Sequence, residues 1–147
     1  MAKYLKILLI LSLSLYFVSL TQDGFAINND YVKGDSPGFL YVLIGGFGLI
    51  FGGAGLSWLA NPFIMLSWFF SFFKKDIISL AFSVLAVIAS CSFLLFDEII
   101  KDEAGNYGQI TDYLLGYWLW IGSCILMLVR NLLLFIGSSQ SKIIENK

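Results

Sequence analysis

Long apolar runs without charge alternate with short polar segments along this chain. An α-helix of about 20 residues crosses the ~30 Å hydrocarbon core of a bilayer. The pattern therefore predicts an all-α integral membrane protein, a four-helix bundle forming one transmembrane domain over 1–147. The predicted spans are residues 4–20, 39–59, 77–96 and 113–136. The polar segments 21–37 and 97–112 are rich in turn residues, and we expect them to be outer loops.

The second apolar run is too long for one span, because residues 39–73 as a single helix would extend roughly 52 Å. Asn61-Pro62 lies inside this run. Asparagine is favoured as a helix N-cap, and proline is favoured at the first helical position. We therefore predict a helix break at Asn61-Pro62, followed by a short extra helix over 62–73.

Two alternatives stay open at this stage. The second run could instead form two shorter spans, 39–54 and 57–73, hinged at the glycines of GGAG. The first run could be a signal peptide, since it begins with a charged segment and is followed by TQDGFA. No clean A-x-A cleavage site follows it, and we favour a retained span.

Charge predicts the orientation of the spans. If both termini lie on the same side as Lys74-Lys75, that side holds seven basic and two acidic residues, and the outer loops hold two basic and eight acidic residues. Lysine and arginine are concentrated on the cytoplasmic side of membrane proteins. We therefore expect a multi-pass protein with cytoplasmic N- and C-termini.

Small residues form two stripes that predict helix packing. Glycine and serine allow the close backbone approach that helices in lipid need. We expect the glycine stripe of the second span to pack on the small stripe of the third, or to form an oligomer contact. The two stripes are Gly45, Gly48, Gly52 and Gly55, and Ser79, Ser83, Ala86 and Ser90.

Arg130 is the one charge embedded in an apolar run, and such arginines are costly in a membrane. Counted along the last span, it should lie near the inner boundary, at the depth of Trp58 and Asn61. We predict that Arg130 contacts Trp58, Asn61 or a free carbonyl at the break. Snorkelling to the headgroups is the simpler alternative.

The second outer loop is the candidate for recognition outside the membrane. Its acidic residues have no EF-hand spacing, so a solvated acidic loop is the simplest interpretation. The segment EAGNYGQITDY contains glycines around a tyrosine, which indicates a shaped turn. The candidate recognition residues are Glu103, Tyr107 and Thr111.

Composition excludes several classes of function. The chain is 59% hydrophobic and 13% charged, with no histidine and two cysteines inside apolar runs. A Ser-His or Cys-His catalytic device is therefore excluded, and neither a zinc site nor a disulfide framework is expected. A net charge of −1 gives no reason to expect nucleic acid. We expect no cofactor, no metal and no enzymatic activity.

The stretch SWLANP (57–62) and the stretch EAGNYGQITDYLLGYWLW (103–120) resemble segments of small, uncharacterised bacterial multispanning membrane proteins. The resemblance covers spans two to four and the second outer loop. It implies a bacterial inner-membrane setting, and it brings no activity, cofactor or site residue.

These observations favour a non-enzymatic membrane protein that acts by packing against itself or against another membrane protein. An accessory subunit, a sensing or defence component and an immunity factor are examples. The partners would be the lipid bilayer and a membrane protein or a second copy. The alternatives are an oligomeric channel or small-solute carrier, and a lipid-binding protein.

Overall fold

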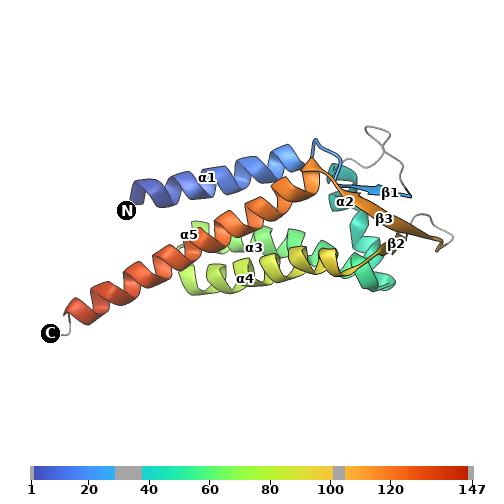
Figure 1. Ribbon diagram of the computed structural model, residues 1–147. Helices are drawn as coiled ribbons and strands as arrows, with labels where there is room; N and C mark the ends of the chain where they lie inside the picture. The colour runs from blue at the N-terminus through green and yellow to red at the C-terminus, as the bar shows by residue number, and fades with distance from the viewer. Residues whose placement is uncertain (1, 29–37, 101–104, 146–147) are drawn as a thin grey trace.

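The computed structural model describes residues 2–28, 38–100 and 105–145, and the chain is mostly helical, as the sequence predicts. Four long helices run roughly along one direction (Figure 1). They are α1 (Ala2–Ser19), α3 (Ala60–Phe72), α4 (Asp76–Ser92) and α5 (Leu115–Glu145). We call these four helices the helix bundle. Within it, α1 packs on α5, and α4 packs on both α3 and α5.

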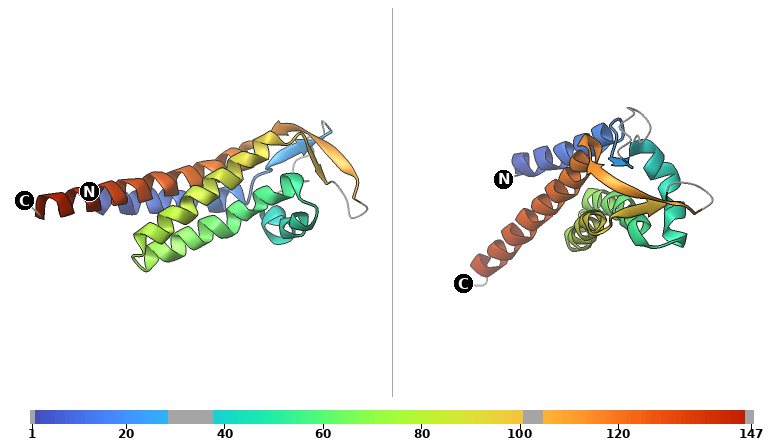
Figure 2. Two further views of the ribbon diagram at one scale, coloured as in Figure 1. Left: turned by 90° about the horizontal axis from the view of Figure 1, so that it is seen from below. Right: turned by 45° about the vertical axis from the view of Figure 1, so that its right-hand side comes forward.

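The two ends of the helix bundle differ. Both termini and the turn between α3 and α4 lie at one end, which we call the terminal end (Figures 1 and 2). A small antiparallel sheet lies at the opposite end, the sheet end. Among the described residues, two helical segments reach the length and apolar composition of a membrane span, Asp76–Leu95 and Leu115–Ser138.

The predicted single span over 39–59 is wrong. The chain instead forms helix α2 (Gly38–Ile44), 3₁₀ helix η1 (Gly45–Ile50) and 3₁₀ helix η2 (Gly53–Leu59). The chain reverses between η1 and η2, where Gly52 and Gly53 have φ of 70° and 57°. Glycine adopts this left-handed conformation without a steric penalty and weakens a continuous helix. The alternative hinge at GGAG is therefore closer to the structure.

The chain does not turn at the predicted break, Asn61-Pro62. A new helix begins there and continues in the same direction. Helix α3 begins at Ala60, and both Leu59 and Ala60 have right-handed helical backbone angles, so η2 passes directly into α3. Proline is tolerated here because the amide groups of the first turn have no helical acceptor. The predicted extra helix over 62–73 is thus the main part of α3, which packs along α4.

The two predicted loops pair into a sheet. Strand β1 (Phe25–Ile27) comes from the first loop, and β2 (Glu98–Ile100) and β3 (Tyr107–Tyr113) come from the second. The strand order is β1-β3-β2, and both pairings are antiparallel. Hence the fold is helical with a small sheet, and the short 3₁₀ helix η3 (Phe93–Leu95) leads from α4 towards β2.

Candidate functional site

A buried polar cluster joins three helices towards the terminal end of the bundle. The Asn131 side-chain amide on α5 donates to the hydroxyls of Ser79 at 2.9 Å, Ser83 at 3.1 Å and Ser67 at 3.2 Å. Ser67 and Ser79 also donate to each other's backbone carbonyls, both at 2.8 Å. All four side chains are buried. The cluster therefore holds α3, α4 and α5 in register through hydrogen bonds that no solvent competes for.

A second serine contact joins α1 to α5. Ser12 donates to the carbonyl of Ser123 at 2.9 Å, and Ser123 donates to the carbonyl of Ser12 at 2.8 Å. The Trp68 indole on α3 also donates to the Ser12 hydroxyl at 3.1 Å. Small side chains at this crossing let the two backbones approach closely.

Asn61 forms the hydrogen-bonding centre nearest the sheet end. Its side-chain oxygen accepts from the Tyr16 hydroxyl at 3.1 Å and from the Trp120 indole at 2.9 Å, while its amide donates to the Trp58 carbonyl at 3.1 Å. Trp58 in turn donates to the carbonyl of Val42 at 3.2 Å. These bonds connect α1, α2, η2, α3 and α5 at one buried side chain.

A cavity of about 120 Å³ opens beside Asn61. Five glycines and a set of aromatic side chains form most of its wall, so its surface is mainly apolar. An apolar cavity of this size accepts a ring-sized or chain-like apolar group. The lining includes Phe25, Gly38, Tyr41, Gly45, Gly55, Trp58, Asn61, Phe93, Gly116, Tyr117 and Trp120.

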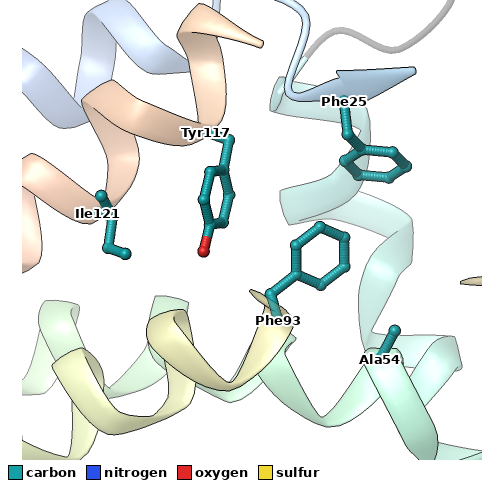
Figure 3. Close-up of a cluster of buried hydrophobic side chains, with 5 residues drawn as sticks. All are labelled: Phe25, Ala54, Phe93, Tyr117 and Ile121. Carbon is teal, nitrogen blue, oxygen red and sulfur yellow. The ribbon is translucent and has the colours of Figure 1, made fainter. Parts of the chain in front are cut away.

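Three aromatic side chains of the cavity lining, Phe25, Phe93 and Tyr117, gather in one buried cluster (Figure 3). Phe25 of β1 faces Phe93 at the end of α4 with ring centroids 5.2 Å apart, and Phe93 lies 5.6 Å from Tyr117 of α5. The Tyr117 hydroxyl donates to the carbonyl of Ser90 at 3.0 Å. Burial, and to a smaller degree the charge of Asp97, raises the pKa of the nearby Tyr113.

The predicted small stripe on α4 is buried, but its partner differs from the prediction. Ser79, Ser83, Ala86 and Ser90 are the buried residues of α4, and the first two bind Asn131 and Ser67 instead of the glycines. The glycines pack within the η1–η2 reversal. A methyl group at Gly55 would overlap the Gly48 carbonyl, and one at Gly45 would lie 2.6 Å from the Trp58 ring. Gly52 forms the turn itself.

The predicted cluster of Trp58, Asn61 and Arg130 is brought together only in part. Trp58 and Asn61 are hydrogen-bonded, but the Arg130 guanidinium donates to Asn131 at 2.9 Å. The partner of Asn61 on α5 is Trp120, ten residues before Arg130 and roughly 15 Å away along the helix. The predicted depth of Asn61 is wrong. Asn61 lies in the first turn of α3, and this helix runs from there towards the terminal end, where Arg130 was expected to meet it.

Two of the three candidate recognition residues, Tyr107 and Thr111, lie on β3. Tyr107 is exposed at its start, and the Thr111 hydroxyl donates to the carbonyl of Ala26 on β1 at 3.3 Å. Thr111 therefore ties the two outer segments together. Glu103 lies outside the described residues.

The sequence analysis missed Asn131, Tyr16 and Trp120. One signal was present, because Ser67 and Ser71, like Ser79 and Ser83, are spaced by four residues and share a helix face. A buried serine face in lipid needs a polar partner, and Asn131 is an uncharged polar residue in the last span. The neighbouring Arg130 is the stronger sequence feature because it is charged.

This arrangement binds helices together and leaves an apolar cavity, and no group of three or more potential metal ligands occurs within residues 2–28, 38–100 and 105–145. The chain matches no family model, no curated protein and no solved structure. Its function is therefore inferred from geometry and from the physical chemistry of its surfaces.

Proposed function

We propose that this chain is a non-enzymatic integral protein of the bacterial inner membrane that acts by contact with another membrane protein or with a second copy. The observation that carries the proposal is an inverted polarity in the helix bundle. Serines and asparagines occupy its interior, and large aliphatic and aromatic side chains cover its outside.

Helix α4 illustrates the inversion. Its buried face is Ser79, Ser83, Ala86 and Ser90, whereas Ile88 on its outer face is 61% exposed. A helix on the surface of a water-soluble protein has the opposite arrangement, with its apolar stripe turned to the core. Lipid as the surrounding solvent accounts for both faces, because exposed aliphatic groups then cost nothing and buried polar groups hydrogen-bond to one another.

Lengths and charges support four crossings. The rod formed by η2 and α3 is roughly 34 Å long, and the segment from Asp76 to Leu95 is roughly 30 Å long, both close to the hydrocarbon thickness. The lysines of the α3–α4 turn and those near the start of α1 lie at the same end of the bundle as the two termini (Figure 2). With lysine and arginine favoured inside, this end would face the cytoplasm.

The bundle interior favours a contact function over a channel. Ser67, Ser79, Ser83 and Ser123 are completely buried, and each hydrogen-bonds to protein groups. A conducting path needs polar groups that face water or ions. The outer face of α4 is instead a continuous apolar surface suited to lipid or to another helix.

The cavity beside Asn61 favours lipid binding as the second candidate function. Its aromatic and glycine lining suits one hydrocarbon chain or an uncharged ring, and it offers no charged side chain among its lining residues. Such a ligand would enter from the bilayer near the sheet end.

Membrane extraction followed by photocrosslinking tests the main proposal. We expect the protein to stay in membranes after alkaline carbonate washing and to dissolve in detergent. A photoreactive amino acid at Ile88 should then crosslink to one defined protein or to a second copy, while the same group at the buried Ala86 should crosslink only within the chain. Release by carbonate contradicts the membrane assignment, and crosslinks to lipid alone at every exposed α4 position contradict the contact function.

A further inference from the structure

Two buried polar atoms at the terminal end have no hydrogen-bond partner. Among the buried side-chain nitrogen and oxygen atoms of the described residues, these are Ser71 Oγ and Arg130 Nε. Ser71 is 7% exposed, and Arg130 is half-buried. An unpaired buried donor has lost its hydration without gaining a partner, so native proteins rarely leave one without a ligand, ion or water.

Ser71 is unpaired for a specific reason. A serine in a helix usually donates to the carbonyl four residues earlier, which is the carbonyl of Ser67. That carbonyl already accepts the hydroxyl of Ser79 at 2.8 Å. The Ser71 hydroxyl therefore remains available to another acceptor.

Both unpaired atoms belong to residues beside the buried polar cluster of Ser67 and Asn131. Ser71 follows Ser67 by one helical turn on the buried face of α3, and Arg130 directly precedes Asn131, which binds Ser67. Asp76, the first residue of α4, directly follows the α3–α4 turn. The turn itself consists of exposed residues, and its Lys74 amide donates to the Ser71 carbonyl at 3.1 Å.

The chemistry of this corner selects an anion. The Arg130 guanidinium can only donate hydrogen bonds, and the Ser71 hydroxyl can donate one, so a single ligand that accepts hydrogen bonds satisfies both. Lys74 and Lys75 add two positive charges, and Asp76 is the opposing acid, which leaves a net positive corner. A planar guanidinium suits a phosphate group, which has several acceptor oxygens.

We propose that Arg130 and Ser71 bind the phosphate of an anionic membrane lipid at the terminal end of the helix bundle. This inference rests on the proposed membrane function, because that end then lies at the headgroup level of the cytoplasmic leaflet, where anionic lipids gather. The site is separate from the cavity beside Asn61, which suits an uncharged group.

Lipid titration with matched variants tests the site. The purified full chain in phosphatidylcholine-containing detergent micelles would be titrated with dioleoylphosphatidylglycerol, and bound lipid would be counted by native mass spectrometry. We expect Arg130→Gln to weaken binding about tenfold, as for one lost charge-assisted hydrogen bond. Ser71→Ala should weaken it about threefold. Lys3→Gln removes the same charge at the same end of the bundle, and it should change the affinity less than twofold.

A conservative variant, a charge control and a soluble phosphate make the test decisive. Arg130→Lys retains the charge but not the planar fork, and about threefold weaker binding is expected even if Arg130→Gln fails to fold. Equal losses for Lys3→Gln and Arg130→Gln would reduce the effect to general surface charge and overturn the proposal. Glycerol phosphate that binds as tightly as the lipid would overturn the lipid assignment. Carbonate extraction tests the membrane function separately. A protein that stays in the membrane but shows no preference for the anionic lipid therefore contradicts this inference and not the membrane function.

Discussion

The helix bundle and the sheet end of this molecule are built by opposite rules. In the bundle, Ser79, Ser83 and Asn131 are buried, and Ile88 faces outward. At the sheet end, Phe25 and Phe93 are buried, and strand residues such as Glu98, Gln109 and Asp112 are exposed. The sheet end therefore resembles a water-soluble domain, whereas the bundle does not.

With the proposed membrane function, this difference marks where the surrounding solvent changes. An apolar core surrounded by polar residues is stable in water, and a polar interior surrounded by aliphatic side chains is stable in lipid. The change occurs within a few residues, between the apolar surface of α4 and Glu98 on β2. We infer that the outer boundary of the hydrocarbon core lies close to η3.

The largest expected effect contrasts Phe93 with Ile88, two apolar residues close together in sequence. Phe93→Ala leaves a cavity among Phe25, Tyr113 and Tyr117 and should lower the free energy of unfolding by about 3 kcal/mol. Ile88→Ala removes an exposed side chain and should cost less than about 0.5 kcal/mol. Unfolding by denaturing detergent measures both, and equal losses would break the comparison.

The second prediction concerns the polar interior of the bundle. Asn131→Leu preserves side-chain volume but removes the hydrogen bonds to Ser67, Ser79 and Ser83. We expect a loss of about 2 kcal/mol, because each of the three interhelical hydrogen bonds contributes roughly 0.6 kcal/mol in a membrane. Val129→Leu on the exposed face of α5 is the control in the same unfolding assay. A more stable Asn131→Leu variant would show that the bundle core prefers apolar packing.

The third prediction concerns two glycines in different environments. Gly55→Ala places a methyl group against the Gly48 carbonyl and should open the η1–η2 reversal, at a cost of about 1–2 kcal/mol. Gly122→Ala places its methyl 3.5 Å from Leu15, an ordinary contact, and should leave stability unchanged or raise it slightly. Thermal unfolding distinguishes them. Similar melting temperatures for the two variants would contradict the close backbone contact.

The smallest predicted effect is a gain in stability. Lys74 has φ of 55°, a left-handed conformation that glycine adopts more easily at the end of a helix. Lys74→Gly should raise the free energy of unfolding by about 0.5 kcal/mol. Lys75→Gly, at a residue with negative φ, is the control and should not increase stability. A loss on Lys74→Gly would mean that the lysine side chain stabilises the turn.

Much of the helical arrangement could be predicted from the sequence. The α1, α4 and α5 segments are long apolar runs bounded by charge, so their helices begin and end within a few residues of the prediction, except that α5 continues to Glu145. The 39–59 segment failed because apolar composition does not distinguish a span from a reversal. The chain reverses because Gly52 and Gly53 adopt the left-handed conformation. In the sequence, the four glycines on one helix face instead indicated a packing stripe.

The candidate site was less predictable. The sequence indicated the importance of Trp58, Asn61 and the small stripe of α4, but it could not indicate their partners. Tyr16 and Trp120 reach Asn61 from helices more than 40 residues away in the chain. The sheet was also missed, because β1 and β2 have only three residues each and β1 pairs with β3 across more than 80 residues of sequence.

Spin-label accessibility tests the central claim most directly. With Cys91 and Cys124 replaced by alanine, single labels would be placed at Ile88 and at Gln109 in the reconstituted protein. We predict that the label at Ile88 collides mainly with oxygen, which dissolves in lipid, and that the label at Gln109 collides mainly with a water-soluble nickel complex. A label at Ile88 that meets the nickel complex as often as the label at Gln109 would contradict lipid as the solvent of the helix bundle.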